Sequence, residues 1–440
     1  MLKLNRSPIR RISWRGSRSP CVSIQGRRHS HFDVKEHTIR CQHMRERPAG
    51  AAPGRHNDLR LHVKQYTPLK SKNLKSTDVT IIGAHANGFP KEMYEPFWDD
   101  LLEAMEKSGR GIRSIWIADV TGQGQSGISN EDILGPDPCW WDHSRDLLYM
   151  INQFQDQMTG GPLIGIGHSV GGSHLAYLSL LHPSLLQGLV LVDPIIQPDL
   201  ETHKQMARLS TNRRDTWPSR SEAAAKFKAT KFYQQWDSRV LEKWIQYGLR
   251  DSTNDQAGND GPVSLSTKVA QEVYYYLSAA YADERLLRDP KFILQQINPK
   301  DRNSFPLARP ESQELFRRLP EIRPRVQYVF GKQSEASPPH ARHSKLELTG
   351  IGVGGSGGAE QDQVREIVID CGHLVAMERP IECAQACAEF VLRELCTFET
   401  EERRRQDIWR QLDTNERVDI NDAWRQNLGV SSRRQGGQKN

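Results

Sequence analysis

The chain has 440 residues, of which 37% are hydrophobic and 26% are charged, so it is long enough to bury a sizeable core. Its longest apolar stretch, around residues 185–196, is interrupted by Gly188, Asp193 and Pro194. The stretch is shorter than the ~18–20 residues that cross a bilayer, which excludes an integral membrane protein. The net charge of +6 comes from residues 1–31, which carry eight basic side chains and no acidic one. The remaining body is slightly acidic, which excludes a nucleic-acid partner.

The basic N-terminal segment is rich in arginine and serine and lacks the apolar run of a secretory signal. Two interpretations stay open: a disordered extension, or a mitochondrial presequence whose helix is interrupted by Pro8 and Pro20. The seven cysteines are scattered and odd in number, which favours a reducing, intracellular compartment. Cys383 and Cys387 lie one helical turn apart, and we expect them to pack in a core rather than to bind a metal.

From about residue 58, short apolar runs alternate with segments of helical periodicity. The pattern predicts strands at 59–66, 78–84, 112–118, 162–167, 189–193, 326–330 and 366–369, and helices at 96–108, 141–154, 172–181 and 380–395. Strands that alternate with helices at this spacing indicate an α/β fold with a mostly parallel central sheet flanked by helices.

Between residues 197 and 320 the strand pattern stops and aromatic, helical segments replace it, which predicts an inserted helical cap. The expected organisation is a basic extension (1–31), a first part of the core (32–196), the cap (197–320), a second part of the core (321–396) and a charged tail (397–440). In the tail, the pairs Ile408 with Leu412 and Trp424 with Leu428 predict short helices that dock on the body.

The strongest chemical signal is Gly167-His168-Ser169-Val170-Gly171, which matches G-x-S-x-G between a predicted strand and a predicted helix. In this context the serine stands on a strained turn, and the glycines let neighbouring backbone pass closely. The N-terminus of the following helix favours negative charge that develops beside the serine. We therefore predict that Ser169 is a nucleophile.

A base for Ser169 must come from a loop at the same edge of the sheet. His373 directly follows the last predicted strand, in agreement with the chain order serine, acid, histidine. The other histidines lack metal-ligand spacing. Residues 350–355 match G-x-G-x-x-G, but a strand rather than a helix follows them, which argues against a dinucleotide site. We predict His373 as the base and expect no metal and no cofactor.

The segment Ala-His-Ala-Asn-Gly-Phe-Pro at residues 84–90 follows an early predicted strand at the same edge. A tetrahedral oxyanion needs two N–H donors about 3 Å away. We expect the Val170 N–H as the first donor and the Phe89 N–H as the second. Asn87 is the alternative, because the loop has two registers, and a plain tight turn is the remaining interpretation.

Two carboxylates compete for the role of the acid, which would hold the imidazole tautomer and stabilise the imidazolium. After the strand that ends at Phe330, the usual acid position is occupied by Ser334, and Glu335 is the next residue. Asp193, at the end of the strand that follows the nucleophile helix, is the alternative. We favour Glu335 over Asp193, on the condition that its loop tolerates a shift of one residue.

Four side chains are candidates for the substrate pocket: His168 inside the motif, and Trp217, Trp236 and Trp244 of the insertion. Such aromatic side chains predict an apolar acyl pocket. The competing interpretation is that they pack only within the cap.

Several segments resemble a known group of proteins: residues 32–48 (FDVKEHTIRCQHMRERP), 84–96 (AHANGFPKEMYEP), 142–147 (DHSRDL) and 350–358 (GIGVGGSGG). With GHSVGG, they resemble the α/β-hydrolase superfamily over about residues 58–396. Within it they resemble fungal hydrolases of host-selective (AK-toxin-type) toxin biosynthesis clusters and the yeast peroxisomal lipase. The resemblance implies an esterase, lipase or related acyl hydrolase, often peroxisomal. The last residues, Gln-Lys-Asn, are not a Ser-Lys-Leu-type address, so peroxisomal, mitochondrial and cytoplasmic locations all stay open.

The expected function is that of a cofactor-free serine hydrolase acting on a small-molecule ester or thioester with an apolar acyl group, in fungal secondary or lipid metabolism. A serine nucleophile argues against epoxide hydrolase and haloalkane dehalogenase chemistry, which needs an aspartate there. An acyltransferase or a carbon–carbon hydrolase uses the same triad. An alternative of another class is a hydrolase fold kept as a binding protein with little or no turnover. The sequence predicts no particular oligomeric state.

Overall fold

A computed structural model describes residues 31–70, 77–158, 160–199, 201–252, 260–278 and 309–430. The prediction for the basic segment at residues 1–30 and the parts of the predicted cap at residues 253–259 and 279–308 lie outside the described residues.

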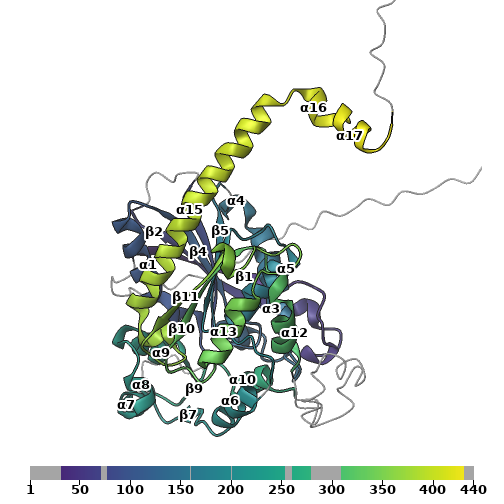
Figure 1. Cartoon of the computed structure of the whole chain (residues 1–440). Coiled ribbons are helices and arrows are strands. Elements are labelled where there is room, and N and C mark those ends of the chain that lie inside the picture. Colours follow the sequence, from purple (N-terminus) through teal and green to yellow (C-terminus); the bar gives the residue numbers. More distant parts are fainter. Residues whose placement is uncertain are drawn as a thin grey trace, which may run out of the picture. The chain divides into compact units, whose positions relative to one another are not determined.

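The centre of the fold is an eight-stranded sheet in the order β1-β2-β4-β3-β5-β6-β10-β11 (Figure 1). Its strands are β1 (Phe32–Arg40), β2 (Arg60–Pro68), β3 (Val79–Ala84), β4 (Ile112–Ala118), β5 (Leu163–His168), β6 (Gly188–Val192), β10 (Arg325–Gly331) and β11 (Val364–Ile369). The pairs β1–β2 and β2–β4 are antiparallel, and every other pair in this sheet is parallel. The predicted fold class, an α/β fold with a mostly parallel sheet, is confirmed.

The sheet is buried on both faces, which explains why its inner strands are mostly apolar. Successive side chains of a strand point to opposite faces. Ile81 therefore lies in one apolar core and Ile82 in the other, and Val190 and Leu191 of β6 divide in the same way. Helices must cover both faces.

The helices of the main body are α1 (Glu95–Lys107), α2 (Gly124–Ser129), α3 (Trp140–Gln153), α4 (Gln155–Met158), α5 (Val170–Leu181), α12 (Glu311–Arg318), α13 (Pro339–Leu348), α14 (Val375–Glu378) and α15 (Pro380–Gln411). Helices α1 and α15 pack against each other in the first core, whereas α3, α5 and α12 share the second. Cys383 and Cys387 are fully buried on α15, in the first core, as expected for packing residues.

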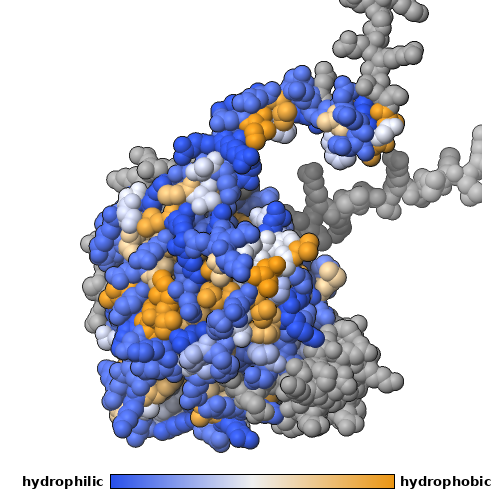
Figure 2. Space-filling model, viewed as in Figure 1, coloured by the Kyte–Doolittle hydropathy of each residue, from blue (hydrophilic) through white to orange (hydrophobic). Residues whose placement is uncertain are grey.

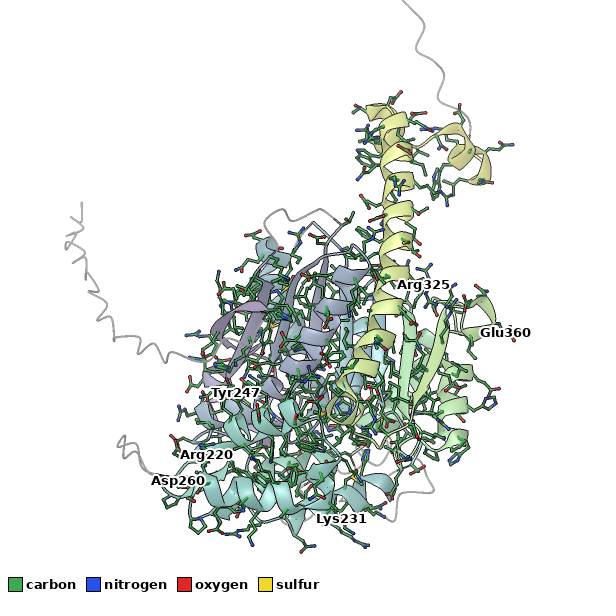
Figure 3. The ribbon with its side chains drawn as sticks, turned by 90° about the vertical axis from the view of Figure 1, so that its left-hand side faces the viewer. Arg220, Lys231, Tyr247, Asp260, Arg325 and Glu360 are labelled. Atoms are coloured by element: carbon green, nitrogen blue, oxygen red, sulfur yellow. The ribbon has the colours of Figure 1, made fainter. Side chains whose placement is uncertain are left out.

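The insertion between β6 and β10 contains α6 (Glu201–Thr211), β7 (Thr216–Trp217), α7 (Arg220–Ala229), α8 (Lys231–Gln234), α9 (Ser238–Tyr247), β8 (Leu249–Asp251), β9 (Val263–Leu265) and α10 (Val269–Tyr276). Strands β7, β9 and β8 form a second, three-stranded sheet that the sequence did not predict. Strands of two or three residues are too short to produce a period-two pattern. Tyr247 and Lys231 mark this part of the chain in Figure 3.

Helix α15 continues 16 residues beyond the predicted end at residue 395 and is followed by the short helices α16 (Thr414–Val418) and α17 (Asp422–Asn427). Near its middle α15 is tied to the sheet by an ion pair of 3.2 Å between Glu394 and Arg325 of β10. Arg325 is labelled beside this helix in Figure 3. Further along, Ile408 and Trp424 are 48% and 62% exposed, so the prediction that the tail docks on the body is wrong (Figure 2). Within the described ranges, no helix has both the length and the apolar character of a bilayer span.

We predict that removal of residues 404–440 leaves the melting temperature within about 2 °C of the full chain, because exposed surface residues contribute little to stability. The shortened chain keeps the ion pair between Arg325 and Glu401, whose atoms lie 3.7 Å apart, and that between Arg110 and Glu399. Differential scanning calorimetry of both chains measures the shift. A loss above about 5 °C would mean that the tail packs against the body after all.

Candidate active site

Ser169 connects β5 to α5 in a strained conformation. Its φ is 58° and its ψ is −122°, a region that costs a non-glycine residue about 1–3 kcal/mol. The turn is held on both sides: the Ser169 N–H donates to the Val192 carbonyl at 2.9 Å, and the Ser169 carbonyl accepts from Ile195 at 3.2 Å. The serine is 6% exposed and stands at the carboxyl edge of the sheet. This is the geometry that the G-x-S-x-G pattern predicts.

Two glycines make the turn sterically feasible. A Cβ on Gly171 would lie 2.2 Å from the Ala84 carbonyl oxygen, and a Cβ on Gly167 would lie 2.5 Å from the Gly171 carbonyl oxygen. Any side chain would therefore separate the nucleophile turn from the end of β3. The absence of side chains at these two positions brings β3, β5 and α5 together.

His373 follows β11 and reaches Ser169 across the edge of the sheet. Its Nε2 lies 2.9 Å from the Ser169 Oγ, and its Nδ1 lies 3.2 Å from Oδ2 of Asp193. Asp193 is fully buried, whereas the His373 side chain is 25% exposed. Serine, imidazole and carboxylate thus form one continuous series.

The environment of Asp193 favours its charged form. Burial opposes ionisation, but the imidazole of His373 and the hydroxyls of Ser334 and Ser337 outweigh it, so the pKa of Asp193 lies below its ordinary value. Asp193 has a φ of 40°, which turns the chain sharply at the end of β6. The Asp193 N–H donates to the Val329 carbonyl of β10 at 2.8 Å, which fixes this turn to the neighbouring strand.

The structure does not bring Glu335, the favoured acid, to His373. The Glu335 carboxylate is exposed and accepts a hydrogen bond from Gln205 at 2.9 Å. The residue at the usual acid position, Ser334, is buried and faces Asp193 instead. The carboxylate beside His373 belongs to the alternative, Asp193. The turn after β6 directs the Asp193 side chain toward His373, whereas the loop after β10 offers only the Ser334 hydroxyl at the usual acid position.

The loop after β3 is fixed by hydrogen bonds that the sequence did not suggest. The Ala86 N–H donates to the Tyr94 hydroxyl at 2.8 Å, and the Gly88 N–H donates to Gln123 Oε1 at 2.7 Å. The Gln123 amide nitrogen in turn donates to Asn87 Oδ1 at 2.7 Å. Gly88 has a φ of 81°, a conformation that glycine adopts without strain, so the loop makes a tight turn there.

The two candidate oxyanion donors of this loop differ in their bonding. The Phe89 N–H donates to the Ala86 carbonyl at 3.3 Å and is therefore used inside the loop. No described residue accepts from the N–H of Asn87, the alternative. Val170 is the first residue of α5, so its N–H is one of the donors that a helix leaves without an internal partner. The loop geometry thus favours Asn87 over Phe89.

The four predicted pocket residues are buried. Trp217, Trp236 and Trp244 are 6%, 6% and 1% exposed and belong to the first core, where Trp236 and Trp244 pack edge-on against Phe89 with ring centroids 5.8 Å away. His168 is 1% exposed, and both of its ring nitrogens have partners within the protein. Trp236 and Trp244 therefore pack across the junction between the insertion and the loop after β3, and not only within the cap.

A buried ion pair supports the far end of the same loop. Asp119, at the end of β4, accepts from the Lys91 ammonium at 2.6 Å and from the Lys91 N–H at 3.0 Å. Both side chains are fully buried, so loss of either partner would leave an uncompensated charge. Asp119 thus stabilises the wall of the site.

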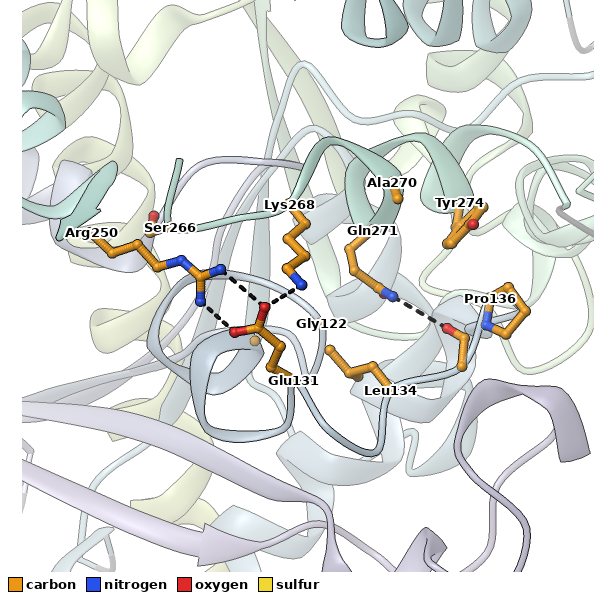
Figure 4. A pocket seen from close by; sticks show the side chains of 12 residues that line it. Gly122, Glu131, Leu134, Pro136, Arg250, Ser266, Lys268, Ala270, Gln271 and Tyr274 are labelled. Carbon is orange, nitrogen blue, oxygen red and sulfur yellow. Dashed lines mark hydrogen bonds and ion pairs between the residues drawn. The ribbon is translucent and has the colours of Figure 1, made fainter. Parts of the chain in front are cut away.

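A pocket of about 320 Å³ lies between the loop that follows β4 and the insertion (Figure 4). The Glu131 carboxylate accepts a hydrogen bond from the Arg250 guanidinium at 3.0 Å and forms an ion pair with Lys268. One carboxylate of the core thus binds two cations of the insertion. Gly122, which lines the pocket, directly precedes Gln123, whose side chain accepts a hydrogen bond from Gly88 in the loop after β3. It is a junction between core and insertion.

Comparison with known proteins agrees with this architecture. A family model described as "Alpha/beta hydrolase family" matches residues 81–386, which include most of β3, the strands β4, β5, β6, β10 and β11, the Ser169 turn and the His373 loop. The chain belongs to the alpha/beta hydrolase family.

Relatives of this chain include fungal proteins. The type I acyl-CoA thioesterase mpaH' of Penicillium brevicompactum is 36% identical over 405 residues, which cover 85% of this chain and 90% of that protein. The abhydrolase domain-containing protein AFT2-1 of Alternaria alternata is 26% identical over 272 residues, covering 61% of this chain and 97% of that protein.

Among solved structures, the peroxisomal alpha-beta-hydrolase Lpx1 of Saccharomyces cerevisiae superposes with a TM-score of 0.64 at 18% identity. The alignment covers 88% of this chain and all of that one, so the fold is shared. The expected resemblance to fungal hydrolases and to the yeast peroxisomal protein is confirmed.

Sequence reasoning did not identify Lys345, a fully buried lysine of α13 near the carboxylate of this hydrolase. Its ammonium donates to the Pro194 carbonyl at 3.2 Å and to the Ser337 hydroxyl at 3.4 Å. Burial lowers the pKa of Lys345 to about 8, although the charge of Asp193 acts in the opposite direction. The surrounding helix, residues 339–348 (PHARHSKLEL), is mostly polar, so nothing in the sequence marks this lysine as buried.

We predict a pH-dependent contribution of Lys345 to stability. Its pKa is lower in the folded chain, so between about pH 8 and 10.5 the unfolded chain binds more protons and the free energy of unfolding rises with pH. Relative to a Lys345→Met variant, the wild type should gain about 1–2 kcal/mol between pH 7.5 and 9.5. Urea unfolding of both proteins at the two pH values measures this difference. Equal changes in both proteins would contradict the assignment.

Proposed function

We propose that this member of the alpha/beta hydrolase family is a serine hydrolase that cleaves an acyl thioester. In this proposal Ser169 is the nucleophile, His373 the general base and Asp193 the acid. The observation that carries it is the series Ser169 Oγ to His373 Nε2 at 2.9 Å and His373 Nδ1 to Asp193 at 3.2 Å. Both distances are within the range at which protons are transferred and charges are stabilised.

In the first half of the reaction, the Ser169 Oγ attacks the carbonyl carbon of the thioester while His373 Nε2 takes the hydroxyl proton. The carbonyl oxygen becomes an oxyanion, and the imidazolium is stabilised by the buried carboxylate of Asp193. The carbon–sulfur bond then breaks, and the imidazolium returns its proton to the departing sulfur. The products are a free thiol and an acyl ester on Ser169.

In the second half, a water molecule gives a proton to His373 and its oxygen attacks the acyl ester. The tetrahedral intermediate collapses, the proton returns to the Ser169 oxygen, and a carboxylic acid leaves. The exposed part of the His373 side chain gives water access to this step. Atoms balance as thioester plus water to carboxylic acid plus thiol.

The oxyanion requires donors fixed before the reaction starts. We propose the Val170 and Asn87 N–H groups. Val170 adds the positive end of the α5 dipole. The hydrogen bonds of Gln123 to Asn87 and to the adjacent Gly88 N–H hold the second donor in place.

The thioester class rests on the relatives. The identity of 36% to the type I acyl-CoA thioesterase mpaH' extends over 85% of this chain. It supports a thioester as substrate over a simple ester. An acyltransferase would use the same acyl-enzyme with an alcohol or amine in place of water, so product analysis distinguishes the two.

The competing proposal of a binding protein without turnover depended on an incomplete triad. The position of Asp193, 3.2 Å from His373, weighs against it. The neighbouring hydroxyls of Ser334 and Ser337, which favour the charged form of Asp193, weigh against it further.

We predict that Ser169→Ala lowers kcat by about 10⁴-fold or more and that Asp193→Asn lowers it by about 10³–10⁴-fold, because the imidazole loses its orientation and charge partner. Steady-state kinetics with an acyl-CoA substrate and detection of the released thiol measure both. Circular dichroism spectra should match those of the wild type.

The matched control is Glu335→Gln, which removes a carboxylate from the neighbouring loop. Its kcat should stay within about twofold of the wild type, because the Glu335 side chain is exposed and bonded to Gln205. Equal losses in Asp193→Asn and Glu335→Gln would refute the assignment of the acid.

We further predict that the thioester is hydrolysed faster than the oxygen ester of the same acyl group. Released thiol and free acid should form in a ratio of one to one with acyl-CoA. A transferred acyl product with added alcohol or amine, at the expense of free acid, would favour an acyltransferase. Labelling of Ser169 by a fluorophosphonate without turnover of any ester or thioester would favour a binding protein.

A further inference from the structure

His168, the second residue of G-x-S-x-G, lies where the three loops around Ser169 meet. Its Nδ1 is 2.9 Å from the Tyr94 hydroxyl, and its Nε2 is 3.0 Å from the backbone carbonyl of His373. The same Tyr94 hydroxyl accepts from the Ala86 N–H at 2.8 Å. One imidazole and one phenol therefore connect the loop after β3, the nucleophile turn and the loop after β11.

The direction of every hydrogen bond in this series follows from chemistry. A carbonyl oxygen only accepts, so Nε2 of His168 carries a proton and donates it to His373. The Tyr94 oxygen accepts from the Ala86 N–H, which leaves its own proton to donate to Nδ1 of His168. The series Ala86 N–H to Tyr94 O–H to His168 to the His373 carbonyl is therefore polarised in one direction, and each bond supports the next.

Both side chains are protected from water and keep the required protonation. Burial and the nearby His373 lower the pKa of His168 to about 3, so its ring is neutral at neutral pH. Burial raises the pKa of Tyr94, so its hydroxyl stays protonated. The series thus keeps the same tautomer throughout the working pH range.

We propose that His168 and Tyr94 form a positioning relay that sets the distance between the oxyanion loop and the general base. The proposal rests on the function proposed above. The relay ends on backbone groups of Ala86, next to the proposed donor Asn87, and of His373, the proposed base. It therefore acts on both partners of the reaction without contacting the substrate. His168 was a predicted pocket residue, and this assigns it a different task.

A histidine that merely fills space would affect stability alone. The relay instead requires an effect on kcat, because His373 must stay in line with Ser169 while the oxyanion donors stay in place. A misplacement of about 1 Å in such a group costs as much as 10²-fold in rate. Substrate binding contacts remain, so KM should change little.

The test separates the two branches of the relay with three substitutions of His168. A glutamine amide reaches the Nε2 position and keeps the bond to the His373 carbonyl, whereas an asparagine amide reaches only the Nδ1 position and keeps the bond to Tyr94. Leucine keeps neither. We expect kcat losses of about threefold to tenfold for His168→Gln and about 10²-fold for His168→Leu, with His168→Asn between them and KM within about twofold.

Tyr94→Phe removes one hydroxyl and leaves the buried Ala86 N–H without its acceptor. We expect a loss of about tenfold or more in kcat. The matched control is Tyr328→Phe. Tyr328 lies in β10 and is also fully buried, and its hydroxyl forms a hydrogen bond of 2.7 Å with Thr349 Oγ1 rather than with a residue around Ser169. The control should lose stability to a similar degree but keep kcat within about twofold.

The double variant Tyr94→Phe with His168→Leu tests whether the two act as one unit. Its kcat loss should be smaller than the product of the two single losses, because both substitutions remove the bond between Tyr94 and His168. Multiplied losses would mean two independent effects and would overturn the relay. Unchanged kcat in Tyr94→Phe and in all three His168 variants would do the same.

A second readout keeps the relay separate from the proposed function. The rate of Ser169 labelling by a fluorophosphonate depends on the same base and oxyanion donors but needs no substrate. If the wild type is labelled but does not hydrolyse acyl-CoA, the proposed function fails. The relay is still tested, because the variants should then be labelled more slowly in the same order.

Discussion

The strained turn at Ser169 is the constraint on which the rest of this site depends. A φ of 58° at a residue with a side chain persists only where surrounding contacts outweigh its cost, about 1–3 kcal/mol. Here those contacts are backbone hydrogen bonds to Val192 and Ile195 and the close approach of Gly171 to the end of β3. Because the turn is tied to β3 and β6, the oxyanion loop and the carboxylate of Asp193 are placed by the same packing that holds the serine.

Much of the fold could be predicted from periodicity because the sheet is buried on both faces. Strand β6 is then apolar throughout and β3 is apolar except for Thr80, so both stand out between amphipathic helices. Strand β1 has the burial pattern of an edge strand, with most of its side chains exposed, and lacks that signal. The end of α15 was predicted too early for a related reason: its outer half has no core partner, and only helix propensity and charge pairing maintain it.

The candidate site divides in the same manner into a local and a non-local part. The positions of Ser169 and His373 were predictable because Ser169 directly follows β5 and His373 lies four residues after the end of β11, and the ends of parallel strands meet at one edge. The choice between Asp193 and Glu335 was not, because it depends on the turn after β6 and on which way the loop after β10 faces. The one indication in the sequence was Ser334: because a hydroxyl occupies the usual acid position, the carboxylate has to come from another loop, here the one after the adjacent strand β6. The register of the loop after β3 likewise depends on Gln123 and Tyr94, which are distant in sequence or outside the motif.

The distribution of charge around the triad favours a single ion pair. An imidazolium that forms at His373 is stabilised by Asp193 and would be opposed by any second cation at close range. The nearest imidazole, His168, is kept neutral by burial and by its two hydrogen bonds. Lys345 carries the nearby ammonium, and it contacts the Pro194 carbonyl and Ser337 rather than the imidazole. The neutral side chains of Tyr94 and His168 thus position the neighbouring backbone through hydrogen bonds. The charged residues that stabilise the surrounding loops, such as Lys91 and Asp119, form ion pairs with each other. In the proposed reaction the strongest electrostatic change therefore falls on the contact between His373 and Asp193, whose atoms lie 3.2 Å apart.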